Sequence, residues 1–198
     1  MRYIILAFIF FHSSMTLFGQ VTQKVYILPE SKIFLDGESN INTFSCELCN
    51  ESERTVLSLC YQPQKLSYIF DQNQYAISVD NFVCDNKHIT SDLKKALKMD
   101  EYPYMYLQLN KLIDFGKSQG NKQAELSITI AGVTNDYCLN YELKPSIENG
   151  EFLVNLASDF DMREFGIEPP TALMGLIKVK KDISIKLHLV LAIVQDDL

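Results

Sequence analysis

One stretch near the C-terminus decides the fold, ISIKLHLVLAI at residues 183–193. Apolar side chains occupy every second position from Ile183 to Ile193, and this period of two is typical of a β-strand. The positions between them change from polar to apolar, with Ser184, Lys186 and His188 followed by Val190 and Ala192. We therefore expect one face of the strand to be buried throughout and the other face only near its C-terminal end.

The same alternation recurs upstream in short runs that polar or glycine-bearing turns separate. The clearest runs cover residues 31–38, 75–80, 104–112, 124–130 and 137–143, and weaker ones cover 25–28, 55–61, 66–70 and 152–156. The turn over residues 132–136 predicts a hairpin. Gly37 lies inside the first run, where a glycine permits a bend or bulge.

Helical signals are scarce. Thr90, Ser91 and Asp92 offer N-cap side chains ahead of residues 93–97, and Pro103 prevents continuation, which predicts a helix of about two turns. A second short helix is expected to start at Ser158 or Asp159 and to end at Phe165, before Gly166. Eight or more strands with one or two short helices indicate an all-β antiparallel fold, a sandwich or a closed barrel.

A barrel is the better solution because closure leaves no unpaired sheet edge. With about eight strands, its interior is just wide enough for side chains or one slender ligand. Such a ligand needs a continuous inward apolar face, and the alternating runs supply one.

The N-terminus has the layout of a secretory leader. Arg2 supplies a positive charge, residues 3–11 are almost wholly apolar, a polar interruption follows at residues 12–14, and Gly19 is small. We expect a signal peptide at 1–19, a single domain at 20–198 and a periplasmic or secreted bacterial protein. An uncleaved anchor is the alternative, although a spanning helix needs about 20 continuous apolar residues. After removal of the leader no integral membrane span is expected.

Charge and motifs argue against several functions. The chain has 18 basic and 25 acidic residues, for a formal net charge of −7, and the basic residues are interleaved with acidic ones. Nucleic acid is therefore a poor partner, as are anionic lipid surfaces. No Gly-x-Ser-x-Gly nucleophile elbow and no glycine-rich phosphate loop is present. His88 and His188 lack metal-ligand spacing, so we expect no metal site, no cofactor and no enzyme.

Five cysteines remain after the leader: Cys46, Cys49, Cys60, Cys84 and Cys138. An odd number leaves at least one thiol unpaired. The Cys46-x-x-Cys49 spacing could indicate a redox pair or half of a zinc site, but no second pair or βαβ unit accompanies it. We favour a disulfide between Cys46 and Cys84, although spacing does not fix connectivity.

Segments in this order resemble those of the YceI-like family. They are SKIFLDGESNINTFSC at 31–46; FVC at 82–84 with NKHI at 86–89, DLKKALK at 92–98 and Tyr102-Pro103; IAGVT at 130–134; and 159–167, which is similar to the family's Asp-Phe-Gly-Ile segment. The resemblance covers roughly residues 31–194. It departs at residues 161–164, where DMRE interrupts the last segment, and in a long cysteine-rich stretch at 46–60.

The resemblance implies an extended, lipocalin-like antiparallel barrel that holds polyisoprenoid or another long amphiphilic lipid in its lumen. The side chains expected to face the lumen are Met105, Leu107, Leu109, Ile128, Ile185, Leu187 and Leu189. Tyr104 and Tyr106 would close a mouth if the strand register slipped by one residue. The alternative is a ligand-free structural or protein-interaction barrel with a packed core. The oligomeric state stays open.

Overall fold

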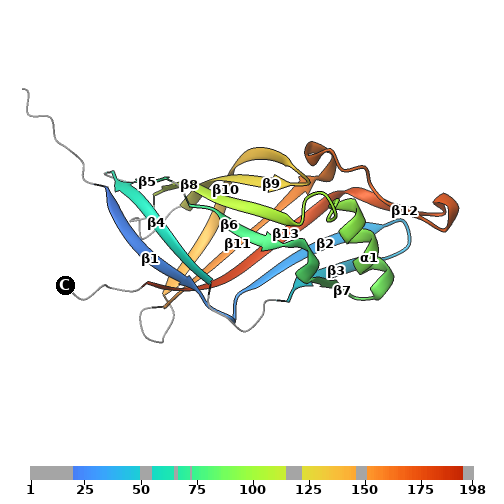
Figure 1. Cartoon of the computed structure of the whole chain (residues 1–198), viewed down its shortest axis with the longest axis horizontal. Coiled ribbons are helices and arrows are strands. Elements are labelled where there is room, and N and C mark those ends of the chain that lie inside the picture. The colour runs from blue at the N-terminus through green and yellow to red at the C-terminus, as the bar shows by residue number, and fades with distance from the viewer. Residues whose placement is uncertain are drawn as a thin grey trace, which may run out of the picture.

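The computed structural model describes residues 20–49, 55–64, 67–71, 73–114, 122–145 and 151–193. The expected signal peptide at 1–19 lies outside them. Figure 1 shows an elongated barrel, with β1, β4 and β5 toward one end and α1 and β12 at the other.

Eight antiparallel strands close a hydrogen-bonded ring, which confirms the predicted barrel. In order around the ring they are β1 (Val21–Ile27), β4 (Thr55–Pro63), β5 (Ser67–Asp71), β8 (Tyr104–Ile113), β9 (Lys122–Ile130), β10 (Val133–Pro145), β11 (Glu151–Asp161) and β13 (Ile177–Ile193). The pairing of β1 with the last residues of β13, Val25 opposite Ile193, completes the ring. Closure of this kind removes the sheet edges.

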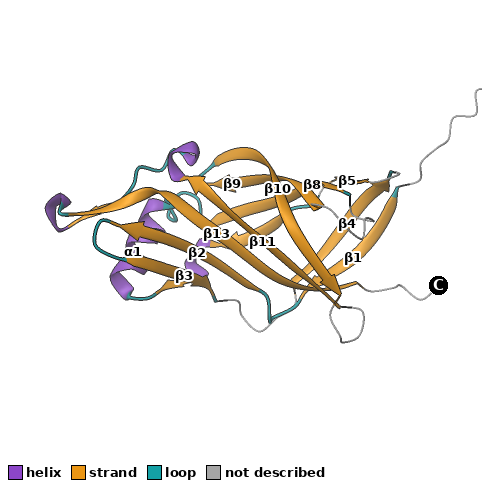
Figure 2. Ribbon diagram, turned by 180° about the vertical axis from the view of Figure 1, so that it is seen from behind, coloured by secondary structure: helices purple, strands orange, loops and turns teal. Residues whose placement is uncertain are grey.

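The other end of the barrel is built differently. There β13 pairs with β2 (Lys32–Ser39), followed by β3 (Thr43–Leu48) and β7 (Phe82–Cys84), while β6 (Tyr75–Ser78) pairs with β8. A short 3-10 turn, η1 (Val79–Asn81), joins β6 directly to β7. The wall is thus closed at this point by a chain corner, and helix α1 (Lys87–Ala96) packs beside it (Figure 2).

Both helix predictions need correction at their starts. Helix α1 begins before Thr90 because Asn86 caps it, its side-chain oxygen accepting bonds from the backbone N–H groups of His88 and Ile89 at 3.0 Å each. Residues 158–161 continue strand β11, since they pair with β13, and only η2 (Met162–Phe165) is helical. Gly166, at φ 64°, ends it as predicted.

The hairpin between β9 and β10 is tighter than expected. Its loop is Ala131-Gly132, both with positive φ, at 49° and 80°. Two such residues form the turn whose twist matches that of the flanking strands. The Tyr102 ring lies where a Cβ on Gly132 would be, so the turn requires glycine there. Two small elements complete the fold: β12 (Thr171–Ala172), which pairs with β13, and η3 (Leu173–Gly175).

Candidate functional site

Two apolar cavities lie inside the barrel, one toward each end. The helix-side cavity has a volume of about 310 Å³ and is lined from α1, η2 and the adjoining strands. The β4-side cavity has a volume of about 340 Å³ and is lined from the eight strands of the ring. Both are at the lower limit of the range typical of small-molecule sites, about 300–1,000 Å³.

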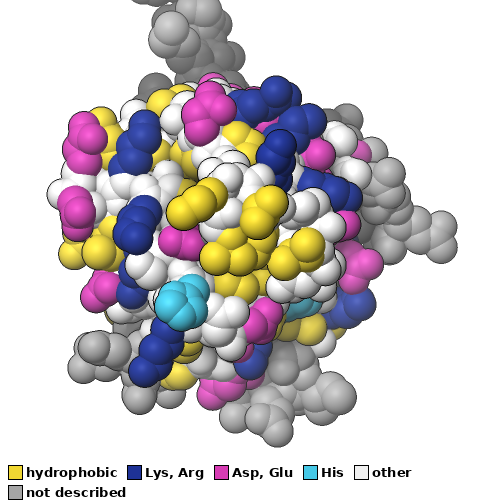
Figure 3. All heavy atoms as spheres, turned by 90° about the vertical axis from the view of Figure 1, so that its right-hand side faces the viewer, with side chains coloured by type: hydrophobic (Ala, Val, Ile, Leu, Met, Phe, Trp, Pro, Cys, Tyr) yellow, Lys and Arg dark blue, Asp and Glu magenta, His cyan; other side chains and the backbone are white. Residues whose placement is uncertain are grey.

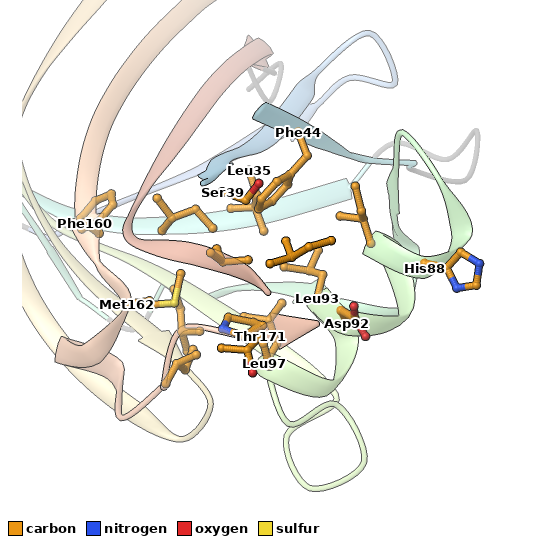
Figure 4. A pocket seen from close by; sticks show the side chains of 18 of the residues that line it. Leu35, Ser39, Phe44, His88, Asp92, Leu93, Leu97, Phe160, Met162 and Thr171 are labelled. Atoms are coloured by element: carbon orange, nitrogen blue, oxygen red, sulfur yellow. The ribbon is translucent and has the colours of Figure 1, made fainter. Parts of the chain in front are cut away.

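Aliphatic and aromatic side chains from distant parts of the sequence meet in the helix-side cavity. Figure 4 shows Leu35 and Phe44 from the β2–β3 hairpin, Leu93 of α1, Leu97 directly after that helix, and Phe160 around it. The polar lining residues include Ser39, Asn42, Asp92 and Thr171, which lie at strand ends, in turns and on the helix. The cavity therefore combines an apolar interior with polar groups from the elements at the end of the barrel.

Two bonds hold α1 over this cavity. A disulfide joins Cys46 of β3 to Cys84 of β7, two residues that lie directly opposite each other in the sheet. The Cys84 N–H then donates to the Thr90 hydroxyl of α1 at 3.0 Å. Leu93 and Leu97 are four residues apart and so share the buried side of the helix. The disulfide is the pair that the sequence analysis favoured.

The turn η2 forms the opposite wall, and Asp161 anchors it. The Asp161 carboxylate accepts from the Arg163 backbone N–H at 3.1 Å, which caps the turn. It also binds the Arg163 guanidinium at 2.5 Å and the Lys181 ammonium at 3.0 Å. These two cations, Arg163 first, hold the pKa of Asp161 well below its usual range. Met162, the second residue of the DMRE segment, thus lines one wall of the helix-side cavity.

Among the residues that the structure describes, none of the side chains lining the β4-side cavity is charged. Leucines from β4, β8, β9, β10, β11 and β13 and tyrosines from β4, β5, β6 and β10 together form most of the wall. Asn73 is buried there because it replaces a missing strand partner: its amide donates to the Leu109 carbonyl at 2.7 Å and accepts from the Leu109 N–H at 2.9 Å. A buried amide that is bonded on both sides costs little.

One polar atom in this cavity lacks a partner. The Tyr141 hydroxyl is buried and makes no hydrogen bond to the described residues. Its burial raises the pKa of Tyr141 to about 12. This wall of the cavity therefore has an unused hydrogen-bonding group. Leaving a buried hydroxyl unsatisfied is unfavourable, so a ligand that bonds to it would gain stability.

Three buried isoleucines separate the two cavities. Ile33, Ile77 and Ile128 have 2, 5 and 8% of their surface exposed and line neither cavity. Their register partners locate the boundary. Ile77 is opposite Met105, which lines the helix-side cavity, whereas Ile128 is opposite Leu107, which lines the β4-side cavity. We call Ile33, Ile77 and Ile128 the partition.

No protein-family model matches the sequence, and no curated protein matches it. Solved structures do match the fold. A polyisoprenoid binding domain from Saccharophagus degradans, implicated in plant cell wall breakdown, aligns with a TM-score of 0.58 at 8% identity over 85% of this chain and 97% of its own. BcnA of Burkholderia cenocepacia aligns with a TM-score of 0.57 at 14% identity over 81% and 95%.

A variant of the Campylobacter jejuni YceI protein aligns with a TM-score of 0.51 at 19% identity, over 71% of this chain and 82% of its own. The chain has the YceI fold. The resemblance that the sequence motifs indicated is therefore confirmed at the level of the fold. Within the described residues, no helix is long and apolar enough to cross a membrane.

In this barrel the predicted lumen residues are divided between the two cavities and the partition. Met105 and Ile185 line the helix-side cavity, and Leu107, Leu109, Leu187 and Leu189 line the β4-side cavity. Ile128 lies in the partition. Sequence reasoning did not select Leu112, which reaches the same cavity because a β-bulge between Leu109 and Lys111 shifts the alternation of β8 by one residue.

Tyr104 and Tyr106 line neither cavity, and the register slip on which their expected role at a mouth depends is not seen in β8. Strand β8 keeps the register that directs Met105 and Leu107 inward, which leaves the two tyrosines on the outer face. Their rings lie 6.4 Å apart and Tyr104 is exposed.

The remaining candidates for chemistry do not converge. Cys49 and Cys138 are exposed free thiols, and Cys60 is a partly buried one. His188 bonds the Asn155 side chain at 2.8 Å on the outer face of the barrel. His88 contributes to the lining of the helix-side cavity, with its ring directed outward (Figure 4). In the part of the chain that the structure describes, no group of three or more His, Cys, Asp or Glu residues could hold a metal ion.

Proposed function

We propose that this chain is an exported binding protein that holds a long amphiphilic or polyisoprenoid-type lipid in the barrel lumen. The observation that carries the proposal is the pair of apolar cavities inside one closed sheet. The S. degradans domain with the same fold, which binds polyisoprenoid, supports it. The proposal includes no catalytic step.

The lining favours a ligand with one polar end. Uncharged, mostly aliphatic side chains surround the β4-side cavity, which suits a hydrocarbon chain. Asp92, Asn42 and Thr171 belong to the helix-side lining, where they could bind hydroxyl or amide groups of a head group. We infer that the tail lies toward β4 and the head toward α1, so a ligand that fills both cavities displaces side chains of the partition.

The alternative, a ligand-free interaction module, predicts a lumen that is filled with side chains. Cavities of about 310 and 340 Å³ are larger than the voids of an ordinary core, where gaps larger than a water molecule are few. They favour the binding protein.

Export is part of the proposal. The Cys46–Cys84 disulfide supports it, since such bonds persist in oxidising compartments. The expected cleavage after Gly19 is tested by intact mass measurement of the protein recovered from the periplasm or medium. A mature chain that keeps residues 1–19 would contradict it.

Lipid binding is tested by mass spectrometry of an organic extract of the purified, disulfide-intact protein. A long-chain lipid at close to one per protein is expected. Leu59→Trp fills the β4-side cavity from a partly buried position, whereas Ser58→Trp adds the same ring on the outer face of the same strand. L59W should lower the bound lipid at least tenfold and S58W should leave it unchanged. No lipid in the extract, together with no binding of added dodecanol, overturns the proposal.

A further inference from the structure

A short hairpin extends from the helix end of the barrel and exposes large apolar side chains. It is formed by β12, η3 and the start of β13, and it projects beyond the body in Figure 1. Leu173, Met174 and Leu176 are 68, 107 and 74% exposed, and Ile41 of the β2–β3 turn is 64% exposed. We call these four residues the apolar tip.

Hydrogen bonds join the two parts of the apolar tip. The Asn40 backbone N–H donates to the Lys178 carbonyl at 3.0 Å, and its side-chain amide donates to the Leu176 carbonyl at 2.9 Å. The Asn40 side-chain oxygen accepts from the Lys178 N–H at 2.8 Å. The β2–β3 turn, which carries Ile41, is therefore fastened to the hairpin.

The backbone of the hairpin is unusual. Leu173, Met174 and Gly175 have φ values of 49°, 57° and 87°, a left-handed region that large side chains rarely adopt. Leu173 and Met174 accept this conformation without gaining any burial. Exposed, locally unfavourable apolar residues of this kind indicate a function outside the folded monomer.

The apolar tip continues into the rim of the helix-side cavity. Ile41 lines that cavity, as do Pro170 and Thr171 before the tip and Ile177 after it. Whatever covers the tip therefore also lies against the end of the cavity at which the proposed ligand presents its head group.

The chemistry of the tip favours a lipid surface over a protein. No charged residue occurs in residues 169–177 or in residues 39–43. Figure 3 shows apolar side chains in the middle of this end, with charged side chains around them. A specific protein interface takes about 800 Å² and 20–30 residues from each partner, far more than four side chains on a projecting loop offer.

A bilayer sets no such minimum, because each apolar side chain can enter the boundary between head groups and acyl chains separately. The net charge of −7 argues against anionic lipids. We propose that the apolar tip inserts into a zwitterionic bilayer and so places the helix-side cavity against the membrane. The use of this contact, loading or release of lipid, depends on the proposed function, but the insertion does not.

The absence of tryptophan from the sequence makes a direct test simple. Met174→Trp places a single tryptophan in the tip, and Val56→Trp places one at an exposed position on the wall strand β4. With phosphatidylcholine vesicles, M174W fluorescence should shift to the blue and be quenched by lipids brominated on the acyl chains, whereas V56W should not respond. Equal responses, or none from M174W, overturn the proposal.

Vesicle flotation is a second test that does not require an introduced tryptophan. Leu173→Asp with Leu176→Asp should lower the vesicle-bound fraction at least tenfold, whereas Val56→Asp with Val83→Asp, two exposed valines, should leave it within twofold. Binding that requires phosphatidylglycerol, or self-association that the tip variant abolishes without vesicles, contradicts the proposal.

Lumen lipid is measured on the same variants. If the wild-type protein carries lipid but does not float with vesicles, the proposal for the apolar tip is overturned and the proposed function is not. A wild-type protein that floats but carries none overturns the proposed function alone.

Discussion

Gly37 of β2 and Phe44 of β3 are register partners, and the Phe44 ring covers Gly37 so closely that a Cβ would overlap it. The ring also lines the helix-side cavity. A glycine within this strand pattern predicts a bend or bulge. The neighbouring register does shift, between Val179 and Ile183 of β13, but the contact with Phe44 adds a second reason for glycine.

Gly37→Ala should therefore lower the free energy of unfolding by about 1–3 kcal/mol, because the added methyl group displaces a packed ring. Urea unfolding measures this. Combined with Phe44→Ala, the same change should cost much less, because the ring that it displaces is gone, and a double-mutant cycle gives the coupling. If G37A costs the same with and without Phe44, the ring is not the cause.

Replacement of both Cys46 and Cys84 by alanine should lower the free energy of unfolding by about 3–4 kcal/mol. The bond closes a loop with a sequence separation of 38, and the stabilisation from restricting the unfolded chain grows slowly with loop length. Hydrogen exchange should increase first in α1, which follows Cys84. Serine at Cys49, Cys60 and Cys138 is the control, and it should leave the response to a reductant unchanged.

Ile33→Ala should join the two cavities. Ile33 is opposite Leu187 in the sheet and belongs to the partition. Truncation of a buried isoleucine costs about 2–5 kcal/mol, against about 0.5–1.5 for the control Ile33→Val. Among primary alcohols of increasing chain length, the best binder of I33A should be longer than that of the wild type. An unchanged optimum would show that the partition does not limit ligand length.

Tyr141→Phe should not destabilise the protein at neutral pH, because the hydroxyl that it removes is buried and has no partner among the described residues. Burial raises the pKa of Tyr141 to about 12, while an unfolded tyrosine ionises near pH 10. Stability is therefore intact below about pH 10 and falls as the pH approaches 12, where the unfolded chain has released a proton that the folded chain retains.

Urea unfolding at several alkaline pH values gives the slope of stability against pH. Because Y141F lacks this hydroxyl, its slope between about pH 10 and 12 should correspond to about one proton fewer released on unfolding than in the wild type. The loss due to Tyr137 should remain, since burial and the bond to Glu164 at 2.7 Å also raise its pKa. A marked loss of stability in Y141F at neutral pH would mean that the hydroxyl has a partner.

The helices show where reasoning from the sequence stopped. Thr90, Ser91 and Asp92 are all good N-cap residues, and the sequence does not say that Asn86 is used instead. Asn86 follows the Cys84 strand at once, so tertiary pairing decides where the chain leaves the sheet and the helix begins. Similarly, residues 158–161 have helix-capping side chains but become strand because β13 offers them hydrogen-bonding partners.

By itself the sequence determined which side chains share a face of each strand, except in β8 beyond the bulge that turns Leu112 inward. Alternation from Ile183 to Ile193 is a local property, since successive residues of a strand point to opposite faces whatever the strand pairs with. It also correctly indicated an all-β barrel, because that many half-apolar strands need a common interior.

Only the tertiary structure decided what the interior contains. Whether an inward side chain lines a cavity, as Leu107 does, or fills the space between cavities, as Ile128 does, depends on side chains that reach it from strands far away in the sequence. The same holds for the exposed Leu173 and Met174, whose sequence resembles that of a core segment. Packing depends on many contacts between residues that are far apart in the sequence, and a local pattern of residues does not specify those contacts.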